Sequence, residues 1–545
     1  MAGASTTGLA DFAPPGPGTW LLDAVHMPRP FTRFQQAIHP PALDAGFRET
    51  MARYGVLVAT LDYKFINGLG YFQPVPAPPE EIPARIAAAQ AAVEKRIWRA
   101  DLDRWLHEVK PASIVSSMAL QRIDPAALGD AALHEHIGAC IAHLSRMVRQ
   151  HHSFNGAAIL PVGDFIASVV EWSGQPAGQF LSLLRGAAPE SAGSFPELDS
   201  LVEALRSSAS GREILFSGDA GAALSRLRAA PGDVGAAATA YLDLVSWRLL
   251  DSLDAGDPTA IEMPEVLASG IRRAVEDGAP AAAHAGKGEE ARLRDLIPDG
   301  HKAAYDDLLA ETRMLSRLRD ERGLYSDVWA AGLARRALLE AGRRLVEAGR
   351  LHEPAHLIEG DPAEIDGLIR GRGGPDADEL AERCDVRMSL RATDGPPFLG
   401  EPPHPPPPLD GLPPATVRMM RALGTAIDAI FAPSHAASED GIVRGTAASP
   451  GTYKGTARLI AGPHEFTRIQ RGDVLVTATT TEAFNIVLPL LGAMVTDAGG
   501  LLSHAAIVSR EYGIPGVVGC LDATARIPDG ATVSVDGTTG EVRVL

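Results

Sequence analysis

From about Pro83 to residue 370, apolar residues recur every three or four positions along the chain. The spacing is clearest in 82–109 (IPARIAAAQAAVEKRIWRADLDRWLHEV) and in 132–148 (ALHEHIGACIAHLSRMV). A helical period of 3.6 residues places such side chains on one face, which is then buried against a core. Loops rich in glycine and proline separate these runs. Further helices are predicted at 194–209, 235–253, 302–349 and 363–371.

The first 80 residues lack this period. The stretch 13–30, APPGPGTWLLDAVHMPRP, contains five prolines. Proline has no backbone N–H and fixes φ, so it interrupts helices. We therefore predict an irregular N-terminal module over residues 1–80, without long helices, that packs on the helical region.

The chain after residue 390 begins with a proline-rich stretch. Between Arg391 and Pro414 the prolines are so frequent that neither a helix nor a central strand is expected. A short helix is predicted at 415–431, and a second break at 432–441. We interpret residues 391–440 as a linker that contains one short helix.

After Gly441 the pattern changes to short β-rich runs that alternate with turns. One helical run, 503–513, ends at a glycine. This alternation predicts a compact α/β domain over residues 441–545. The predicted strands are 452–460, 473–478, 493–498, 516–519, 532–537 and 541–545.

Length and composition narrow the class of protein. A chain of 545 residues is too long for one hydrophobic core, so several domains are expected. A formal net charge of −18 disfavours binding to nucleic acid or to an anionic membrane, because either would favour a basic surface. No apolar run has the length of a transmembrane helix, and the N-terminus lacks the features of a secretory signal. With three cysteines and no metal-like pair among them, we expect a cytoplasmic protein without disulfides or a metal site.

One histidine lies at the start of the predicted C-terminal helix. The segment 496–510 predicts a strand, a turn at Gly499 and Gly500, and a helix whose first turn contains Ser503 and His504. The amides and the dipole of a helix N-terminus favour phosphate oxygens. A neutral imidazole is nucleophilic near neutral pH, and its N–P bond is labile enough to pass a phosphoryl group on. We predict that His504 carries a phosphoryl group, which Ser503, Gly499 and Gly500 contact.

A serine N-cap followed by a structural histidine is the simpler interpretation, and for an isolated Ser-His pair it is the better one. The wider sequence favours the carrier. Residues 499–519, GGLLSHAAIVSREYGIPGVVG, resemble the signature of the swivelling phosphohistidine domain of PEP-utilising enzymes, and 448–460 and 528–545 are similar to its first and last strands. Phosphoenolpyruvate synthase, pyruvate phosphate dikinase, rifampicin phosphotransferase and phenylphosphate synthase share this domain. The loop from Thr479 to Leu491 departs from the Trp-Thr-Pro element of many relatives.

The resemblance implies a carrier that moves between a donor site and an acceptor site. In the family the donor site is an ATP-grasp domain or a phosphoenolpyruvate-binding barrel, and neither is recognisable in this sequence. The resemblance therefore implies a hetero-oligomer in which a separate ATP-grasp subunit, of the PEP/pyruvate-binding type, binds ATP and Mg²⁺, with no cofactor in this chain. Residues 1 to about 430 are similar to the helical acceptor-binding domain of phenylphosphate synthase and rifampicin phosphotransferase.

The expected fold class is multidomain, with a large, mainly α-helical acceptor-binding region followed by an α/β swivelling phosphohistidine domain. The predicted parts are the N-terminal module, 1–80, the helical acceptor-binding domain, 81–390, the linker, 391–440, and the phosphohistidine domain, 441–545.

A polar cluster at His151, His152 and Asn155 interrupts the helical pattern and is a candidate acceptor site. Adjacent histidines point about 100° apart on a helix, so at most one should face the same pocket as Asn155. A histidine there could act as general base to an acceptor hydroxyl. A metal site is not expected, because the i, i+4 ligand spacing is missing. The alternative is a solvated helix end with one core histidine, and the sequence favours neither.

A second cluster contains Arg319, Arg322 and Tyr325, which share adjoining faces of a predicted helix. Guanidinium groups bind phosphoryl oxygens and offset their charge during transfer. Charge runs of this kind are more often solvated faces, but a comparable arginine-containing segment lines the acceptor pocket in the family that the chain resembles. By that resemblance, Arg319 and Arg322 bind the phosphoryl group and Tyr325 contributes to substrate binding.

The predicted function is that of an acceptor-binding and phosphoryl-carrier subunit of an ATP-dependent, dikinase-like phosphotransferase. The resemblance to phenylphosphate synthase favours a small hydroxylated acceptor that is aromatic, such as a phenol. An antibiotic hydroxyl, as in rifampicin phosphotransferase, is the second hypothesis. The third is a non-catalytic ligand-binding module with a regulatory phosphohistidine.

Overall fold

The computed structural model describes residues 11–188, 190, 193–250, 252–277, 287–431, 441–481, 484, 485 and 487–545. Its contacts divide the chain into two compact units. Unit 1 comprises Met1–Gly156, Ser252–Pro258 and Arg322–Met420, and unit 2 comprises Ala157–Asp251, Thr259–Glu321 and Arg421–Leu545. Each unit therefore gathers three separate stretches, whereas the domains predicted from the sequence are contiguous. The second predicted break, at 432–440, lies outside the described residues.

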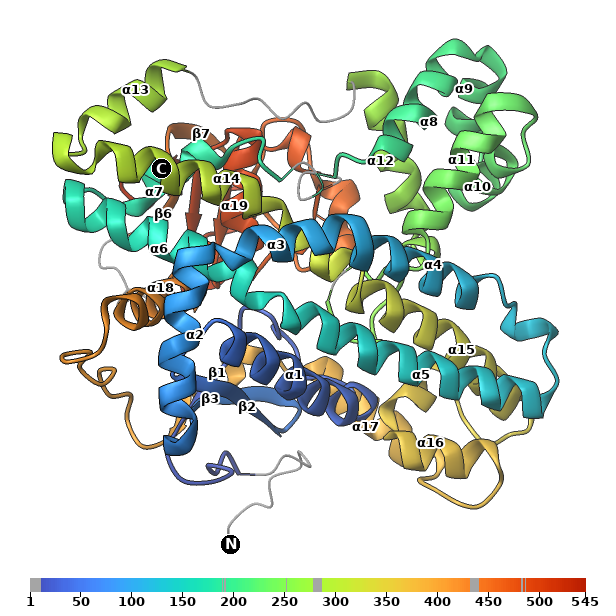
Figure 1. Ribbon diagram of the computed structural model, residues 1–545. Helices are drawn as coiled ribbons and strands as arrows, with labels where there is room; N and C mark the ends of the chain where they lie inside the picture. The colour runs from blue at the N-terminus through green and yellow to red at the C-terminus, as the bar shows by residue number, and fades with distance from the viewer. Residues whose placement is uncertain are drawn as a thin grey trace, which may run out of the picture. The chain divides into compact units, whose positions relative to one another are not determined.

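Unit 1 combines long helices with a small antiparallel sheet (Figure 1). The helix α5 packs against both α1 and α15. Its buried face carries Leu133, Ile137, Leu144 and Val148, which recur at helical spacing as the sequence predicts. The helices of unit 1 are α1 (Arg33–Arg53), α2 (Ile82–Lys95), α3 (Ile97–Arg104), α4 (Lys110–Gln121), α5 (Asp130–Ser153), α15 (Asp327–Glu347), α16 (Pro362–Ile369) and α17 (Ala377–Ser389).

The prediction of an irregular N-terminal module without long helices is wrong. The strands β1 (Thr19–Leu22), β2 (Val58–Ile66) and β3 (Leu69–Pro76) lie in one sheet, and α1 continues for 21 residues through Pro40 and Pro41. The Thr32 hydroxyl caps α1 by accepting from the Gln35 amide at 3.2 Å. An interior proline costs a helix about 3 kcal/mol or more. Burial of the α1 face that packs on α5 offsets this cost.

Part of the predicted linker belongs to the same sheet, whose strand order is β2-β3-β1-β4. The strand β4 (Phe398–Gly400) pairs antiparallel with β1 at the edge of the sheet. A proline-rich segment tolerates an edge strand because one side of its backbone needs no ladder partner. Residues 401–408 are exposed, and α18 (Pro414–Phe431) forms at the short helix that the sequence predicts.

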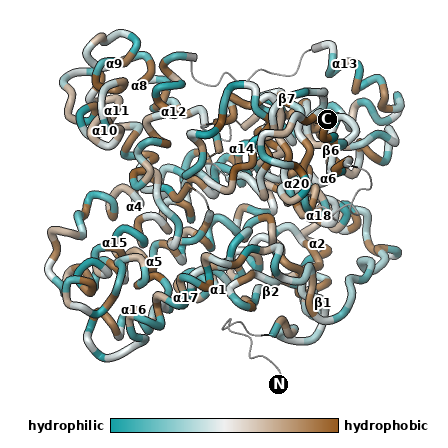
Figure 2. The backbone as a smooth tube through the Cα atoms, turned by 180° about the vertical axis from the view of Figure 1, so that it is seen from behind, coloured by the Kyte–Doolittle hydropathy of each residue, from teal (hydrophilic) through white to brown (hydrophobic). Residues whose placement is uncertain are grey.

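Unit 2 contains two groups of helices and a large sheet. The helices α8 to α12 pack on one another. Figure 2 shows hydrophobic and hydrophilic residues alternating along α8 and α11, as expected for helices with one buried face. The helices of unit 2 are α7 (Ala177–Leu181), α8 (Pro196–Ser207), α9 (Ala209–Phe216), α10 (Ala220–Arg228), α11 (Gly232–Val245), α12 (Pro264–Asp277), α13 (Lys287–Asp295), α19 (His504–Tyr512) and α20 (Ala523–Arg526), together with most of α6 (Asn155–Ser173), α14 (Lys302–Leu324) and α18.

The predicted helical run 302–349 is two helices. The helix α14 ends at Leu324, and α15 begins at Asp327. Ser326 leaves the helical region, with φ −120° and ψ −101°. The break places the Asp327 carboxyl in the first turn of α15, where the helix dipole favours a negative charge.

An eight-stranded sheet forms the C-terminal part of unit 2, in the order β5-β12-β11-β7-β8-β9-β10-β6. The pairs β7–β8, β8–β9 and β9–β10 are parallel, and the outer pairs are antiparallel. All six predicted strands and the predicted helix are present, whereas β5 and β6 were not predicted. The strands are β5 (Ile442–Arg444), β6 (Thr446–Ser449), β7 (Thr452–Leu459), β8 (Val474–Thr477), β9 (Ala493–Thr496), β10 (Gly516–Val518), β11 (Thr532–Asp536) and β12 (Glu541–Val544).

This sheet has a separate hydrophobic core on each face. Leu475 of β8 and Met494 of β9 lie in one core, with Ala505 and Val508 of α19. Their strand neighbours, such as Val474, belong to the other core. Because successive side chains on a strand point to opposite faces, both faces of β8 and β9 are apolar, as expected for parallel strands that are covered on both sides.

The length of α19 is set by Gly513, as the sequence predicts. Gly513 adopts φ 65°, and a Cβ there would lie 2.6 Å from the Arg185 guanidinium. We expect Gly513→Ala to lower the free energy of unfolding by about 1–2 kcal/mol, as measured by chemical denaturation. Gly424, inside α18, has open space at the corresponding position and serves as the control. Equal losses in both variants would contradict this role for Gly513.

One helical stretch of the described chain, 130–173, is long and apolar enough to cross a membrane by length and composition. Its most apolar window is 78% buried inside the protein. A core helix of a globular domain shows the same combination.

Candidate active site

His504 is the first residue of α19, at the position that the sequence predicts. The chain leaves β9 at Thr496, turns, and enters the helix after Ser503. Ser503 is the N-cap, and its hydroxyl accepts from the Ala506 amide at 3.4 Å. The N-terminus of α19 therefore supplies backbone amides and a positive dipole end beside the half-buried His504 ring.

Thr480 fixes the orientation of this ring. Its Oγ1 lies 2.9 Å from His504 Nδ1. Thr480 follows β8 and His504 follows β9, and these strands are parallel neighbours. Their carboxyl ends meet at one edge of the sheet, where sites of α/β folds commonly form. Thr480 was not among the residues predicted from the sequence, although both strands were, and this edge rule was the signal that could have found it.

The two glycines before the helix have different surroundings. Gly499 adopts φ 105°, and a Cβ there would lie 2.7 Å from Ser503 Oγ, so a side chain would disturb the cap. The Gly500 amide donates to the Ile430 carbonyl at 3.0 Å. That bond anchors the turn to α18, and the Gly500 amide is already engaged.

Arg319 lines a small, partly enclosed cavity of about 40 Å³ in unit 2. Leu502, Ile507 and Arg510 line the same cavity from the segment around α19. The Arg319 side chain is 14% exposed, and its Nε is 3.9 Å from Asp320. Burial lowers the pKa of Arg319, and it lowers that of Arg510 to about 10. Two guanidinium groups are thus held at a poorly solvated place beside the helix that carries His504.

The other predicted residues gather in unit 1, at the C-terminal end of α5. His151 Nδ1 is 2.9 Å from the Asp327 carboxylate. Asp327 lies at the break between α14 and α15, and its side chain is 3% exposed. A buried carboxylate on Nδ1 fixes the tautomer and orientation of an imidazole and leaves Nε2 to act as an acid or base.

His152 lies beside His151, and the two rings stack with centroids 4.7 Å apart. Asn155 Nδ2 donates to His152 Nδ1 at 3.3 Å. The expectation that only one histidine would approach Asn155 therefore holds for the direct contact, which His152 makes. Because the rings stack, both histidines nevertheless belong to one cluster.

Arg322 joins this cluster through Asn155. Its Nη1 donates to Asn155 Oδ1 and, at 3.4 Å, to the His151 carbonyl. Arg319 and Arg322 were predicted to act together, but they belong to different compact units. Tyr325 is buried, and the Lys110 ammonium lies 4.3 Å from its ring centroid.

His39 of α1 adds a third ring that the sequence analysis did not single out. It meets His152 edge to face, with centroids 5.7 Å apart. Burial lowers the pKa of His39 to about 4 and that of His152 well below its usual range, so both rings are neutral near pH 7. Burial raises the pKa of Asp327 to about 7, against the lowering effect of His39 and Arg322. A carboxyl with that pKa is partly protonated near pH 7, so Asp327 can exchange a proton with His151 across their contact.

No group of three histidine, cysteine, aspartate or glutamate side chains among the described residues could hold a metal ion.

Residues 469–540, which include Thr480 and His504, match the family model described as PEP-utilising enzyme, mobile domain. This segment is a PEP-utilising enzyme mobile domain. Probable phosphoenolpyruvate synthase of Archaeoglobus fulgidus is 44% identical over 101 residues, 18% of this chain and 13% of that protein. That alignment is about as long as the C-terminal α/β domain predicted over residues 441–545.

Two other relatives match over a longer stretch than the mobile domain. Rifampicin phosphotransferase of a Streptomyces species is 30% identical over 343 residues, 59% of this chain and 36% of that protein. An uncharacterized phosphotransferase of Bacillus subtilis is 27% identical over 316 residues, 56% of this chain and 36% of that protein. This chain thus spans about a third of the length of these phosphotransferases. Both alignments are too long for a mobile domain, so they include helical sequence as well.

Proposed function

We propose that His504 accepts a phosphoryl group and passes it to the hydroxyl of a small molecule bound at the His151 cluster. The observation that carries the proposal is the position of His504, which starts α19 and contacts Thr480 within the mobile-domain match. The long alignments to phosphotransferases favour a hydroxyl acceptor over the reaction of a phosphoenolpyruvate synthase. His504 and the His151 cluster belong to different units, so the proposal requires the mobile domain to carry the group from donor to acceptor.

In the first step, His504 Nε2 attacks the phosphorus of the donor. The tautomer with a proton on Nδ1 donates to Thr480 Oγ1 and leaves a lone pair on Nε2. The N–P bond forms as the bond between phosphorus and the donor oxygen breaks. The amides at the start of α19, with Ser503, stabilise the added negative charge.

In the second step, the acceptor hydroxyl attacks the phosphohistidine. His151 takes the hydroxyl proton, and Asp327 stabilises the imidazolium that results. The O–P bond forms as the N–P bond to His504 breaks, which returns neutral His504. Arg322 offsets the charge of the phosphoryl oxygens at the acceptor site, and Arg319 does so beside α19.

We propose that an ATP-grasp polypeptide with bound ATP and Mg²⁺ loads His504, because a carrier histidine needs a donor. We propose a phenol or another aromatic alcohol as the acceptor. The cluster contains the rings of His39, His151 and His152, and planar rings can stack on a planar acceptor. The rifampicin phosphotransferase relatives support a second candidate, the hydroxyl of a larger antibiotic.

The test is a transfer assay with the chain, ATP, Mg²⁺ and a candidate ATP-grasp protein. Phenols and hydroxylated antibiotics are screened in parallel, and products are detected by ³¹P nuclear magnetic resonance. A phosphate ester that forms only when both proteins are present supports the proposal. If His504 becomes phosphorylated but no hydroxyl compound accepts the group, the acceptor assignment is wrong and the regulatory hypothesis replaces it.

Thr480 provides a prediction specific to the first step. Thr480→Val keeps the shape but removes the hydroxyl, so the Nδ1-protonated tautomer loses its acceptor. We expect the rate of His504 phosphorylation to fall about 10- to 100-fold. Thr480→Ser should recover most of the rate, because it restores the hydroxyl. Rapid-quench measurement of phosphohistidine checks this, and equal rates for the valine and serine variants would refute the positioning role.

A further inference from the structure

Unit 1 contains a second site, away from the residues assigned above. An open cavity of about 490 Å³ lies between the N-terminal end of α1, the turn between β2 and β3, and α17. This volume is within the range of small-molecule pockets. One wall is aromatic, because Phe31 and Phe65 stack with centroids 5.7 Å apart.

Another part of the lining is the charged face of α17, formed by Glu379, Glu382, Arg383 and Arg387. Arg383 is already paired, since it donates to Glu364 at 2.8 and 3.0 Å and to Glu379 at 2.6 Å. Glu382 is exposed, and among the described residues it forms no ion pair. The cavity is therefore lined by two phenyl rings and by an exposed carboxylate that can meet a ligand.

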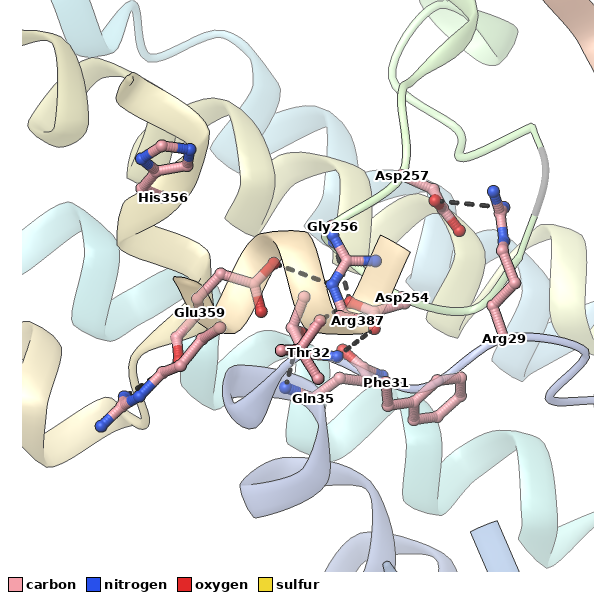
Figure 3. Close-up of polar contacts among 12 residues, drawn as sticks. Arg29, Phe31, Thr32, Gln35, Asp254, Gly256, Asp257, His356, Glu359 and Arg387 are labelled. Carbon is pink, nitrogen blue, oxygen red and sulfur yellow. Dashed lines mark hydrogen bonds and ion pairs between the residues drawn. The ribbon is translucent and has the colours of Figure 1, made fainter. Parts of the chain in front are cut away.

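Further carboxylates lie close to Arg387, one of the lining residues. Arg387 is buried and donates to Glu359 at 2.8 Å, and Figure 3 shows its guanidinium between Glu359 and Asp254. Arg29 pairs with Asp257 at 3.2 Å. Burial raises the pKa of Asp254 and of Glu359, while Arg387 opposes both shifts. The guanidinium groups therefore compensate the buried carboxylates only in part.

The balance of charge around the cavity is negative. Arg33 is the remaining base in the lining, and its nearest carboxylate is Glu364 at 3.8 Å. The lining residues and the residues that interact with them supply six carboxylates against four guanidinium groups. The carboxylates are Asp254, Asp257, Glu359, Glu364, Glu379 and Glu382, and the bases are Arg29, Arg33, Arg383 and Arg387.

We infer that this cavity binds an organic amine, with its apolar body on Phe31 and Phe65 and its ammonium group at Glu382. The excess of carboxylates and the faces of the phenyl rings both attract a cation electrostatically and so favour its binding. A carboxylate ligand of the same shape would meet net repulsion. The inference is independent of the phosphoryl chemistry, because it uses neither His504 nor the His151 cluster.

The test compares three probes that share a phenyl ring, namely 2-phenylethylamine, 2-phenylethanol and 3-phenylpropionate. Calorimetry and ligand-observed magnetic resonance on the full chain measure their binding. We expect the amine to bind with a Kd of about 0.1–1 mM, at least about tenfold tighter than the carboxylate. Added salt should weaken binding of the amine, because it screens the attraction between the charges.

Two variants on α17 locate the site. Glu382→Gln should raise the Kd of the amine about three- to fivefold, because it removes the exposed charge. Asp385→Asn makes the same charge change on the same helix, but Asp385 is exposed and does not line the cavity. It should leave binding unchanged. Phe65→Ala should raise the Kd of the amine about fivefold. Failure of the amine to bind, equal binding of the carboxylate, or equal effects of Glu382→Gln and Asp385→Asn would each overturn the inference.

Discussion

Replacing His504 by alanine or asparagine is expected to abolish phosphoryl transfer, with a rate loss of at least about 10⁴-fold. No other group of this chain replaces the nucleophile in the proposed scheme, and asparagine cannot form the labile N–P bond. The measurement is product formation in the assay that contains the chain, the proposed ATP-grasp protein and an acceptor.

The control must separate loss of chemistry from loss of fold. His504 is half-buried at a helix start, so its truncation should leave the denaturation curve close to that of the parent chain. His464 is an exposed histidine in the same domain, and His464→Ala should retain full transfer. Transfer that persists in a folded His504→Ala protein would contradict the carrier role.

Asp327→Asn and His151→Ala are expected to slow transfer to the acceptor about 10²- to 10⁴-fold. An amide in place of the Asp327 carboxylate would remove the negative charge that orients His151 and stabilises its protonated form. Loading of His504 should stay within about twofold of the parent rate, because neither residue takes part in the first step. Single-turnover assays that start from the phosphorylated chain isolate the second step.

The pH dependence follows from the same pair. The base must be deprotonated to accept the hydroxyl proton, so the second step should speed up as pH rises through about 7, the pKa to which burial raises Asp327. His134, which also lies on α5, forms a more exposed histidine–aspartate pair with Asp366 at 2.7 Å. Asp366→Asn should therefore leave the second step unchanged. Equal losses in Asp327→Asn and Asp366→Asn would argue against a specific base.

The C-terminal sheet could be predicted in detail because its elements are set by local patterns. The runs that became β8 and β9 are apolar on both faces, and α19 ends at Gly513 in a left-handed conformation. These features depend on neighbours within a few residues, so the sequence alone determines them. The short strands β5 and β6 were missed because they are stabilised by partners far along the chain, namely β12 and β10.

The N-terminal region was predicted wrongly because local propensity did not decide its structure. Proline disfavours helix, yet α1 continues through Pro40 and Pro41 because its buried face packs on α5, about 100 residues later. The break between α14 and α15 shows the opposite error. The apolar period continues through it, and only the structure reveals that Asp327 turns toward His151.

Some residues of the candidate site could be predicted from local sequence, and others could not. His504 could be predicted because its motif is contiguous and lies at a helix start. Thr480 was missed although the edge of the two predicted strands could have indicated it, whereas His39 and Asp327 could not be predicted, since each meets its partner only after distant segments pack together. Arg319 and Arg322 are three residues apart on the chain, but neighbours in sequence can serve different compact units.

The most direct test of the central claim is to map the phosphoryl group on the chain. The chain is incubated with a candidate ATP-grasp protein, Mg²⁺ and ATP, then isolated, digested under mildly alkaline conditions and analysed by mass spectrometry. The account predicts one acid-labile, base-stable phosphoryl group on His504, which disappears when an acceptor is added. A phosphoryl group on another residue, or one on His504 that no acceptor removes, would contradict it.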